Sequence, residues 1–124
     1  MKKAEEIYQT ALILLGEDSP EETRAFGERY LPLLNLLISE NESLIRALRG
    51  NGEQEDARVY APTDPVGVPT PVGEVLLPLG LAGLLIQAEE PERASFFLRR
   101  YEDERIRLES RGRIGRRHPI TRPY

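Results

Sequence analysis

Residues Val75 to Leu108 read VLLPLGLAGLLIQAEEPERASFFLRRYEDERIRL, and the rest of the chain is expected to be organised around them. Its first half, Val75 to Ile86, contains no charged residue, whereas its second half is charged and carries Phe96, Phe97 and Tyr101. A helix that is apolar on every side needs partners on nearly every side. The rest of the chain must therefore be arranged to cover Val75 to Ile86.

Two helices and a short third one are predicted upstream of this stretch. Apolar side chains follow the i, i+3, i+4, i+7 spacing of one helical face at Ala4, Ile7, Tyr8, Ala11, Leu12 and Leu15. Ser19, Pro20 and Glu22 have the spacing of a capping box with proline at the first helical position, so a second helix begins there. We expect Pro32 to kink or break that helix, because proline crowds the preceding turn. The polar residues 39–42 predict a further break before a short helix.

Residues 50–70 have no helical period and are rich in glycine, proline and aspartate, with one short piece of β character at residues 58–60. Loops of this length inside compact domains are usually functional or disordered. Two interpretations stay open at this point. The segment is a mobile surface loop, or it orders against a neighbouring subunit or lines a channel.

The central helix is predicted to begin at Thr70-Pro71 and to bend at Pro78. Gly80 and Gly83 each cost about 1 kcal/mol of helix propensity relative to alanine. In return, both glycines let another backbone approach closely, which predicts tight packing on this helix.

The last helix is predicted to begin near Pro91. Its buried stripe comprises Ala94, Phe97, Leu98, Tyr101 and Leu108. Asp103 and Arg107 are spaced for an i,i+4 ion pair, and Gly112 is expected to end the helix. The pattern as a whole predicts a mainly α fold: a small bundle of four to five helices over residues 1–110, with a long loop at 50–70 and an extended basic C-terminal arm at 111–124.

The charge of the chain is unevenly distributed. Residues 111–124 carry five arginines and no acid, a net charge of +5, while the remaining residues carry −9, which together give the net charge of −4. Three interpretations of this basic arm are open: a solvated terminus, phosphate contacts without base specificity, and docking of an extended peptide on a protein surface. The apolar residues Ile114, Ile120 and Tyr124 between the arginines suit the last.

No catalytic, metal or cofactor site is predicted. The only histidine is His118 and there is no cysteine, which excludes disulfides and zinc sites of the Cys/His type. Glu89, Glu90 and Glu92 crowd one turn, but acids are favoured at a helix start by the helix dipole. No serine has the GxSxG context of a nucleophile elbow, and no phosphate-binding loop is present. The apolar stretch is shorter than the roughly 20 residues that a membrane span needs, so no membrane contact is expected.

The order of these features resembles the head–tail connector (adaptor, or head-completion) proteins of tailed bacteriophages. The first helix ends in Leu14-Leu15-Gly16, and the second carries LPLLNLL at residues 31–37. After a proline-containing loop, LPLGLAGLL at residues 77–85 is similar to the family's leucine-proline-x-glycine-leucine-alanine start of the central helix. EPERASFFLRRY at residues 90–101 is similar to the family's acidic turn, proline and aromatic helix.

The resemblance implies a structural virion protein and not an enzyme. Such proteins assemble in the host cytoplasm into a dodecameric ring at the neck of the virion, dock on the portal, extend the DNA channel and receive the tail or the next neck protein. An acidic channel wall would let DNA slide without specific binding. The predicted portal-binding residues are those of the arm: Arg111, Arg113, Ile114, Arg116, Arg117, Ile120 and Tyr124.

A second set of residues is predicted to pack between copies of the chain. The stretch Val75 to Ile86 is too apolar for a four-helix monomer to cover completely, so part of its cover is expected from the next copy, at Leu79, Gly80, Gly83 and Leu84. Two other functions are considered: a nucleic-acid-associated helical regulator that binds through the basic arm, and a cellular helical interaction module. The first predicts an affinity for DNA that falls steeply with salt.

Overall fold

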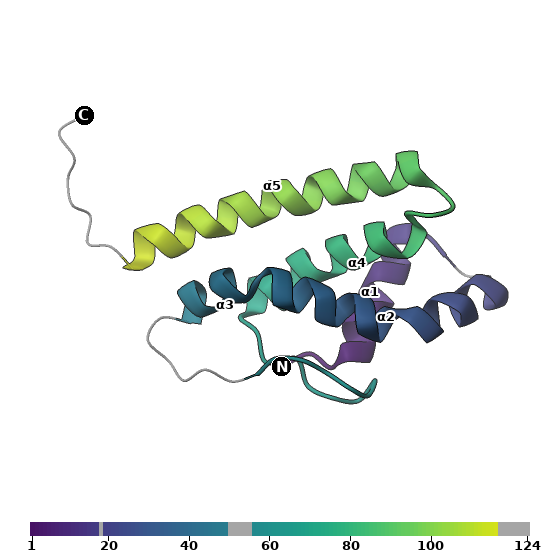
Figure 1. Cartoon of the computed structure of the whole chain (residues 1–124), viewed down its shortest axis with the longest axis horizontal. Helices are drawn as coiled ribbons and strands as arrows, with labels where there is room; N and C mark the ends of the chain where they lie inside the picture. The colour runs from purple at the N-terminus through teal and green to yellow at the C-terminus, as the bar shows by residue number, and fades with distance from the viewer. Residues whose placement is uncertain (18, 50–55, 117–124) are drawn as a thin grey trace.

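The computed structural model describes residues 1–17, 19–49 and 56–116 and confirms a mainly α fold (Figure 1). Within those ranges there are five α-helices, one π-helical segment and no strand. The elements are α1 (Ala4–Leu15), α2 (Pro20–Glu40), α3 (Glu42–Arg49), η1 (Val72–Leu76), α4 (Leu77–Ile86) and α5 (Pro91–Arg116).

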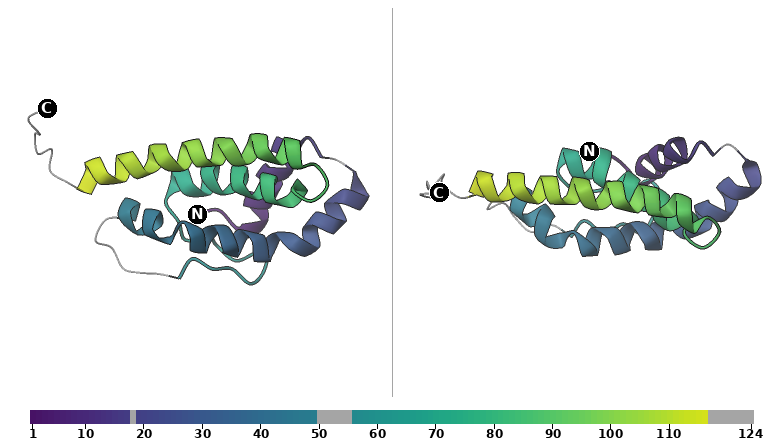
Figure 2. Two further views of the ribbon diagram at one scale, coloured as in Figure 1. Left: turned by 45° about the horizontal axis from the view of Figure 1, so that its top comes forward. Right: turned by 90° about the horizontal axis from the view of Figure 1, so that it is seen from above.

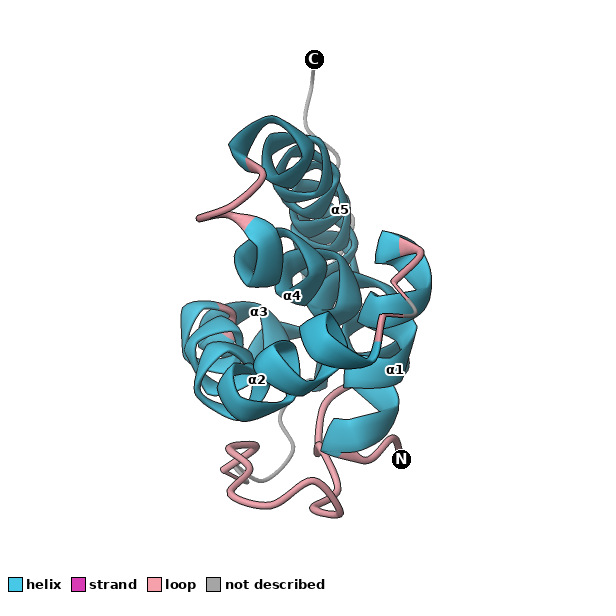
Figure 3. Ribbon diagram, turned by 90° about the vertical axis from the view of Figure 1, so that its right-hand side faces the viewer, coloured by secondary structure: helices cyan, strands magenta, loops and turns pink. Residues whose placement is uncertain are grey.

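Helix α4 is the centre of the bundle. It packs against α1, α2 and α5, which lie around it when the molecule is viewed along the bundle (Figure 3). Every residue of α4 is buried except Leu84, which is half-buried. Within one copy, the other helices of the chain therefore cover nine of the ten residues of α4.

Two glycines allow the close approach of neighbouring helices to α4. A Cβ atom built on Gly83 would lie 2.6 Å from Cγ of Leu98 on α5. One built on Gly80 would lie 2.9 Å from Cδ2 of Leu37 on α2 and 3.0 Å from the ring of Tyr101 on α5. The tight packing predicted for both glycines is therefore present, and it joins α4 to its own neighbours.

Pro78 is accommodated by a local change of helix type. The turns before it form the π-helix η1, in which Leu77 N–H donates to the carbonyl of Val72, five residues back. Proline has no N–H and crowds the carbonyl four residues before it. A wider π turn places that carbonyl farther from the proline ring, and π segments occur mostly as single turns of this kind.

Pro32 does not break α2, which continues from Pro20 to Glu40 and changes direction along its length (Figure 2, left). The break predicted at residues 39–42 is confirmed, since Asn41 separates α2 from α3. The capping box predicted at Ser19 is wrong. Ser19 is the N-cap residue, but its side chain makes no capping bond, and its carbonyl accepts a hydrogen bond from the Thr23 hydroxyl at 2.7 Å.

Residues 56–69 pack on the bundle as an ordered strap. Val59 and Val66 are fully buried, and Val66 N–H donates to the carbonyl of Lys2 at 2.8 Å. Ala4 N–H donates to the carbonyl of Asp64 at 2.9 Å, which fixes the strap beside the start of α1. The β piece predicted at residues 58–60 is wrong; the described residues show only an isolated bridge between Lys3 and Pro65.

Helix α5 extends farther than predicted, through Gly112 to Arg116. A glycine inside a helix costs only about 1 kcal/mol, and arginines are favoured at a helix C-terminus by the dipole. The predicted pair of Asp103 with Arg107 is also replaced, because Arg107 instead contacts Glu104 at 2.8 Å, three residues before it. The last turns of α5 project past the end of α3 in two views (Figures 1 and 2).

Candidate interaction surfaces

A polar network holds the middle of α5 against the junction of α2 and α3. Asn41, buried at that junction, donates from Nδ2 to the Tyr101 hydroxyl at 2.8 Å and to the carbonyl of Leu37 at 2.8 Å. The Tyr101 hydroxyl in turn donates to the carboxylate of Glu40. Burial, and then the hydrogen bond to Glu40, raise the pKa of Tyr101, so this hydroxyl remains a donor at any physiological pH.

The predicted portal-binding residues begin where this anchoring ends. Leu108 is fully buried, Glu109 and Ser110 are half-buried, and Arg111 is exposed. Arg113, Ile114 and Arg116 were predicted in an extended arm, but the backbone at these positions is helical. The remaining predicted residues, Arg117, Ile120 and Tyr124, lie outside the described residues.

The residues predicted to pack between copies lie in the interior of a single copy. Leu79, Gly80 and Gly83 are buried by other helices of the same chain, and only Leu84 is half-buried. The assignment of these four residues to a contact between copies stays a prediction, and their burial gives it no support. The large apolar side chains that are exposed lie elsewhere, on α1, α2, η1, α5, the strap and the N-terminus: Met1, Ile13, Leu14, Leu36, Tyr60, Val75, Phe96 and Ile106.

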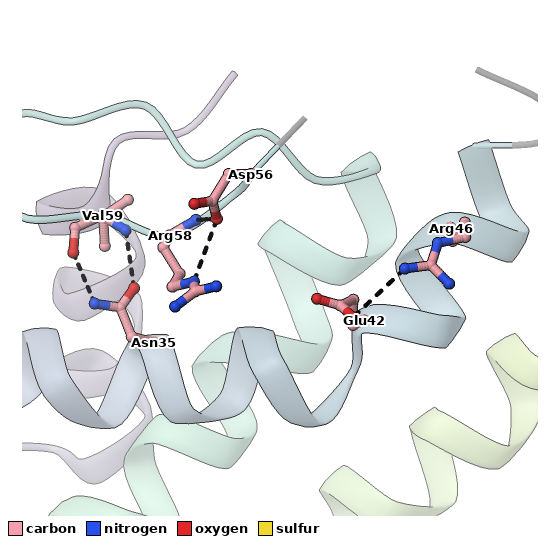
Figure 4. Close-up of polar contacts among 6 residues, drawn as sticks. All are labelled: Asn35, Glu42, Arg46, Asp56, Arg58 and Val59. Carbon is pink, nitrogen blue, oxygen red and sulfur yellow. Dashed lines mark hydrogen bonds and ion pairs between the residues drawn. The ribbon is translucent and has the colours of Figure 1, made fainter. Parts of the chain in front are cut away.

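Asn35 clamps the strap to α2 through two hydrogen bonds to one residue (Figure 4). Its Nδ2 donates to the carbonyl of Val59 at 2.7 Å, and its Oδ1 accepts from Val59 N–H at 2.8 Å. The amide side chain thus pairs with the backbone as a neighbouring strand would. Sequence reasoning did not single out Asn35, because a half-buried asparagine in a helix has no characteristic spacing.

Replacing Asn35 with aspartate is expected to loosen the strap. The carboxylate can still accept from Val59 N–H, but it cannot donate to the Val59 carbonyl, which is left facing a second acceptor. The expected loss of stability is about 1–3 kcal/mol, with faster hydrogen exchange at the amide of Val59. Gln9→Glu, the same chemical change at an exposed position of α1, is the matched control. Equal exchange at Val59 in both variants would show that the clamp does not hold the strap.

Four carboxylates meet at the end of the bundle where α1 and α4 finish. Glu17 folds back on the last turn of α1, with its N–H donating to the carbonyl of Leu12 at 3.1 Å. A hydrogen bond to Glu17 and the charges of Glu17, Glu90 and Glu89 raise the pKa of Glu22 above its ordinary value. The four carboxyl groups concentrate negative charge at this end of the molecule, and their mutual repulsion favours the protonated form of Glu22.

Replacing Glu22 with glutamine is expected to raise the melting temperature at pH 7. The pKa of Glu22 is higher in the folded state than its unfolded value of about 4.5, so the protonated carboxyl stabilises the fold. This stabilisation is fully present below the unfolded pKa and is lost as the pH rises through the folded pKa. The variant should therefore melt higher than the wild type at pH 7 and nearly equal to it below pH 4. Thermal scans at both pH values measure this, and a constant difference between the two proteins would contradict it.

Little else among the described residues has the form of a chemical site. No group of three or more His, Cys, Asp or Glu side chains is placed to hold a metal ion within residues 1–17, 19–49 and 56–116. A shallow pocket of about 240 Å³ lies between the N-terminal residues and the start of η1, lined in part by Lys2, Glu6 and Glu74. None of the helices in the described part of the chain is both long and apolar enough to cross a membrane.

Comparison with known proteins leaves these surfaces to be interpreted from the structure itself. No protein-family model, no curated protein and no solved structure matches this chain.

Proposed function

We propose that this chain is a head–tail connector of a tailed bacteriophage: a virion neck protein that forms a ring, docks on the portal and provides the platform for the tail. The order of sequence features from the LPLLNLL segment to the aromatic helix supports this proposal. The observation that carries it is the C-terminal end of α5, which projects past the end of α3 (Figure 1) and includes the first residues of the basic segment, 111–116.

The geometry of α5 suits a helix that presents an arm to a larger partner. The helix is fixed to the body as far as Leu108 by apolar burial and by the Tyr101 network. From Arg111 to Arg116 it carries three arginines and no acid. Anchoring up to Leu108 sets the direction in which the basic end leaves the body, and this reduces the conformational entropy that is lost on docking.

Co-purification with the portal protein of the same phage genome tests this function. Deleting residues 113–124 is expected to abolish capture of the portal while the helical circular dichroism of the body is retained. The triple charge reversal Arg111→Glu, Arg113→Glu and Arg116→Glu should also weaken capture of the portal. The matched control reverses Arg24, Arg46 and Arg58, which are exposed arginines of the body.

The same variants separate this function from nucleic-acid binding through the arm. A DNA-binding regulator predicts an affinity for duplex DNA that falls steeply with salt and is lost in the triple variant. Undiminished portal capture by the deletion variant would refute the assigned role of the arm. Salt-dependent DNA binding without portal capture would favour the regulator.

A further inference from the structure

Helix α3 is a peripheral element of the bundle. It packs chiefly on α5 and touches the end of α2, and it lies beside the second half of α5 in two views (Figures 1 and 2). Of its eight residues, Leu44 and Ile45 are buried. Its ion pair, Arg46 with Glu42 at 3.4 Å, joins two exposed side chains of α3 itself. A helix of this length is marginal by itself in water, so α3 depends on the few contacts that it makes with the body.

A single residue, Asn41, separates α3 from α2. Its φ of −103° and ψ of 17° lie outside the α-helical range, so the chain turns at this point. Its Nδ2 donates to the Tyr101 hydroxyl on α5 at 2.8 Å, which holds the junction closed. Its Oδ1 is buried and accepts no hydrogen bond within the described part of the chain. A buried acceptor without a donor destabilises the state that buries it, so Oδ1 favours an open state that water can reach.

The attachment of α3 is light beside that of the central helix. At its C-terminal end, Arg49 donates to the carbonyl of Gly67 on the strap. By contrast, nine of the ten residues of α4 are buried. Elements with few buried apolar contacts open locally at a lower free energy than the core does. Helix α3 is therefore expected to open before the helices around α4 separate.

We propose that α3 is a latch: it opens about Asn41 as one unit while the rest of the bundle stays folded, and its closed form fixes the direction of the arginine-bearing end of α5. Tyr101 and Arg105 tie α5 to the α2–α3 junction, since Arg105 Nη2 donates to the carbonyl of Glu40 at 3.3 Å. Opening takes away one of the helices on which the second half of α5 packs. Residues 111–116 then leave the body in a wider range of directions. The latch depends on the body alone, so it stands whatever partner the arm binds.

Native-state hydrogen exchange of the full chain, followed by NMR, tests the opening. The amides of Ile45 to Arg49 make hydrogen bonds within α3 or to Asn41. We expect them to exchange about 100-fold faster than the amides of Leu81 to Leu85 in α4, relative to their unprotected rates, and with little dependence on denaturant. Equal protection of α3 and α4 would mean that α3 opens only in global unfolding, which would overturn the latch.

Two Tyr→Phe variants test the Tyr101 contact. Tyr101→Phe removes a hydrogen bond that opening of α3 breaks, so exchange in α3 should become about tenfold faster. Tyr8→Phe, the matched control, removes the bond from the Tyr8 hydroxyl to the carbonyl of Thr23, which opening of α3 leaves intact. Both variants should speed exchange in α4, because both lower the global stability. Unchanged exchange in α3 of Tyr101→Phe, or an equal increase in Tyr8→Phe, would overturn the proposed contact.

A distance measurement tests the effect on α5. The chain has no cysteine, so Leu36→Cys and Arg111→Cys provide two specific sites for spin labels on exposed positions of α2 and α5. Adding Leu44→Asp and Ile45→Asp should hold α3 open, broaden the distribution of distances between the labels and leave the amides of α4 protected. An unchanged distribution would show that α3 does not orient α5. Loss of protection in α4 would show that α3 does not open separately, and either result would overturn the latch.

Discussion

Replacing Leu81 with alanine is expected to lower the free energy of unfolding by about 2–5 kcal/mol. Leu81 is fully buried near the middle of α4, where α1, α2 and α5 meet. Removing its side chain takes away buried apolar contacts and leaves a cavity that three fixed helices cannot close. Since domains of this size are stable by only about 5–15 kcal/mol, the variant should show a large shift in its urea midpoint.

Leu36→Ala is the control for this prediction. Leu36 lies on α2 and is 56% exposed, so its truncation should change stability by no more than about 0.5 kcal/mol. Equal losses in the two variants would mean that α4 is not the centre of the bundle. A loss confined to Leu81→Ala supports the arrangement in which the chain covers α4 by itself.

Replacing Gly83 with alanine is expected to destabilise the protein even though alanine is the better helix former. The new Cβ would lie 2.6 Å from Cγ of Leu98 and 3.3 Å from the carbonyl oxygen of Ala94. The first distance is too short for any real contact, and the atom it meets is a branch point and not the end of a flexible side chain, so either the Leu98 side chain or α5 itself must shift away from α4. Overpacking of this kind costs about 1–3 kcal/mol, which exceeds the roughly 1 kcal/mol gained in helix propensity.

Gly27→Ala is the matched substitution with the opposite expected sign. Gly27 lies inside α2 on its exposed side, and the nearest atom to a new Cβ is the Tyr8 hydroxyl at 3.7 Å, an ordinary contact. This variant should be more stable than the wild type by about 0.4–1 kcal/mol. Chemical denaturation of both variants checks the pair, and a stabilising Gly83→Ala would refute the tight packing of α5 on α4.

The periodicity of the sequence predicted the helices and most of their buried faces. All six residues of the stripe predicted for the first helix are buried. On α5, Ala94, Phe97, Tyr101 and Leu108 are buried as predicted, and Leu98 is half-buried. The break between α2 and α3 was also predicted, because a run of polar residues there interrupts the apolar stripe.

Features that depend on partners distant in sequence were predicted poorly. The strap is held by Asn35, Asp64 and backbone groups of the N-terminus, none of which has a recognisable spacing. The glycine rule overestimated a local effect, because Gly112 does not end α5. Of the two outcomes predicted for Pro32, a kink or a break, the break is absent, and α2 changes direction along its length (Figure 2, left). The cost of one unfavourable residue is small beside the burial of a whole helix face.

Sequence pattern alone was enough to predict that this chain is helical, that the uncharged stretch Val75 to Ile86 needs cover from the rest of the chain, and that basic charge gathers toward the C-terminus. These properties are local, because hydrophobic period and charge are set by neighbouring residues. The packing of helices sets which surfaces cover Leu76 to Ile86 and which residues, Val75 among them, stay exposed. Burial depends on helices brought together from distant parts of the chain, so Gly80 and Gly83 lie in the interior while Ile13 and Ile106 face outward.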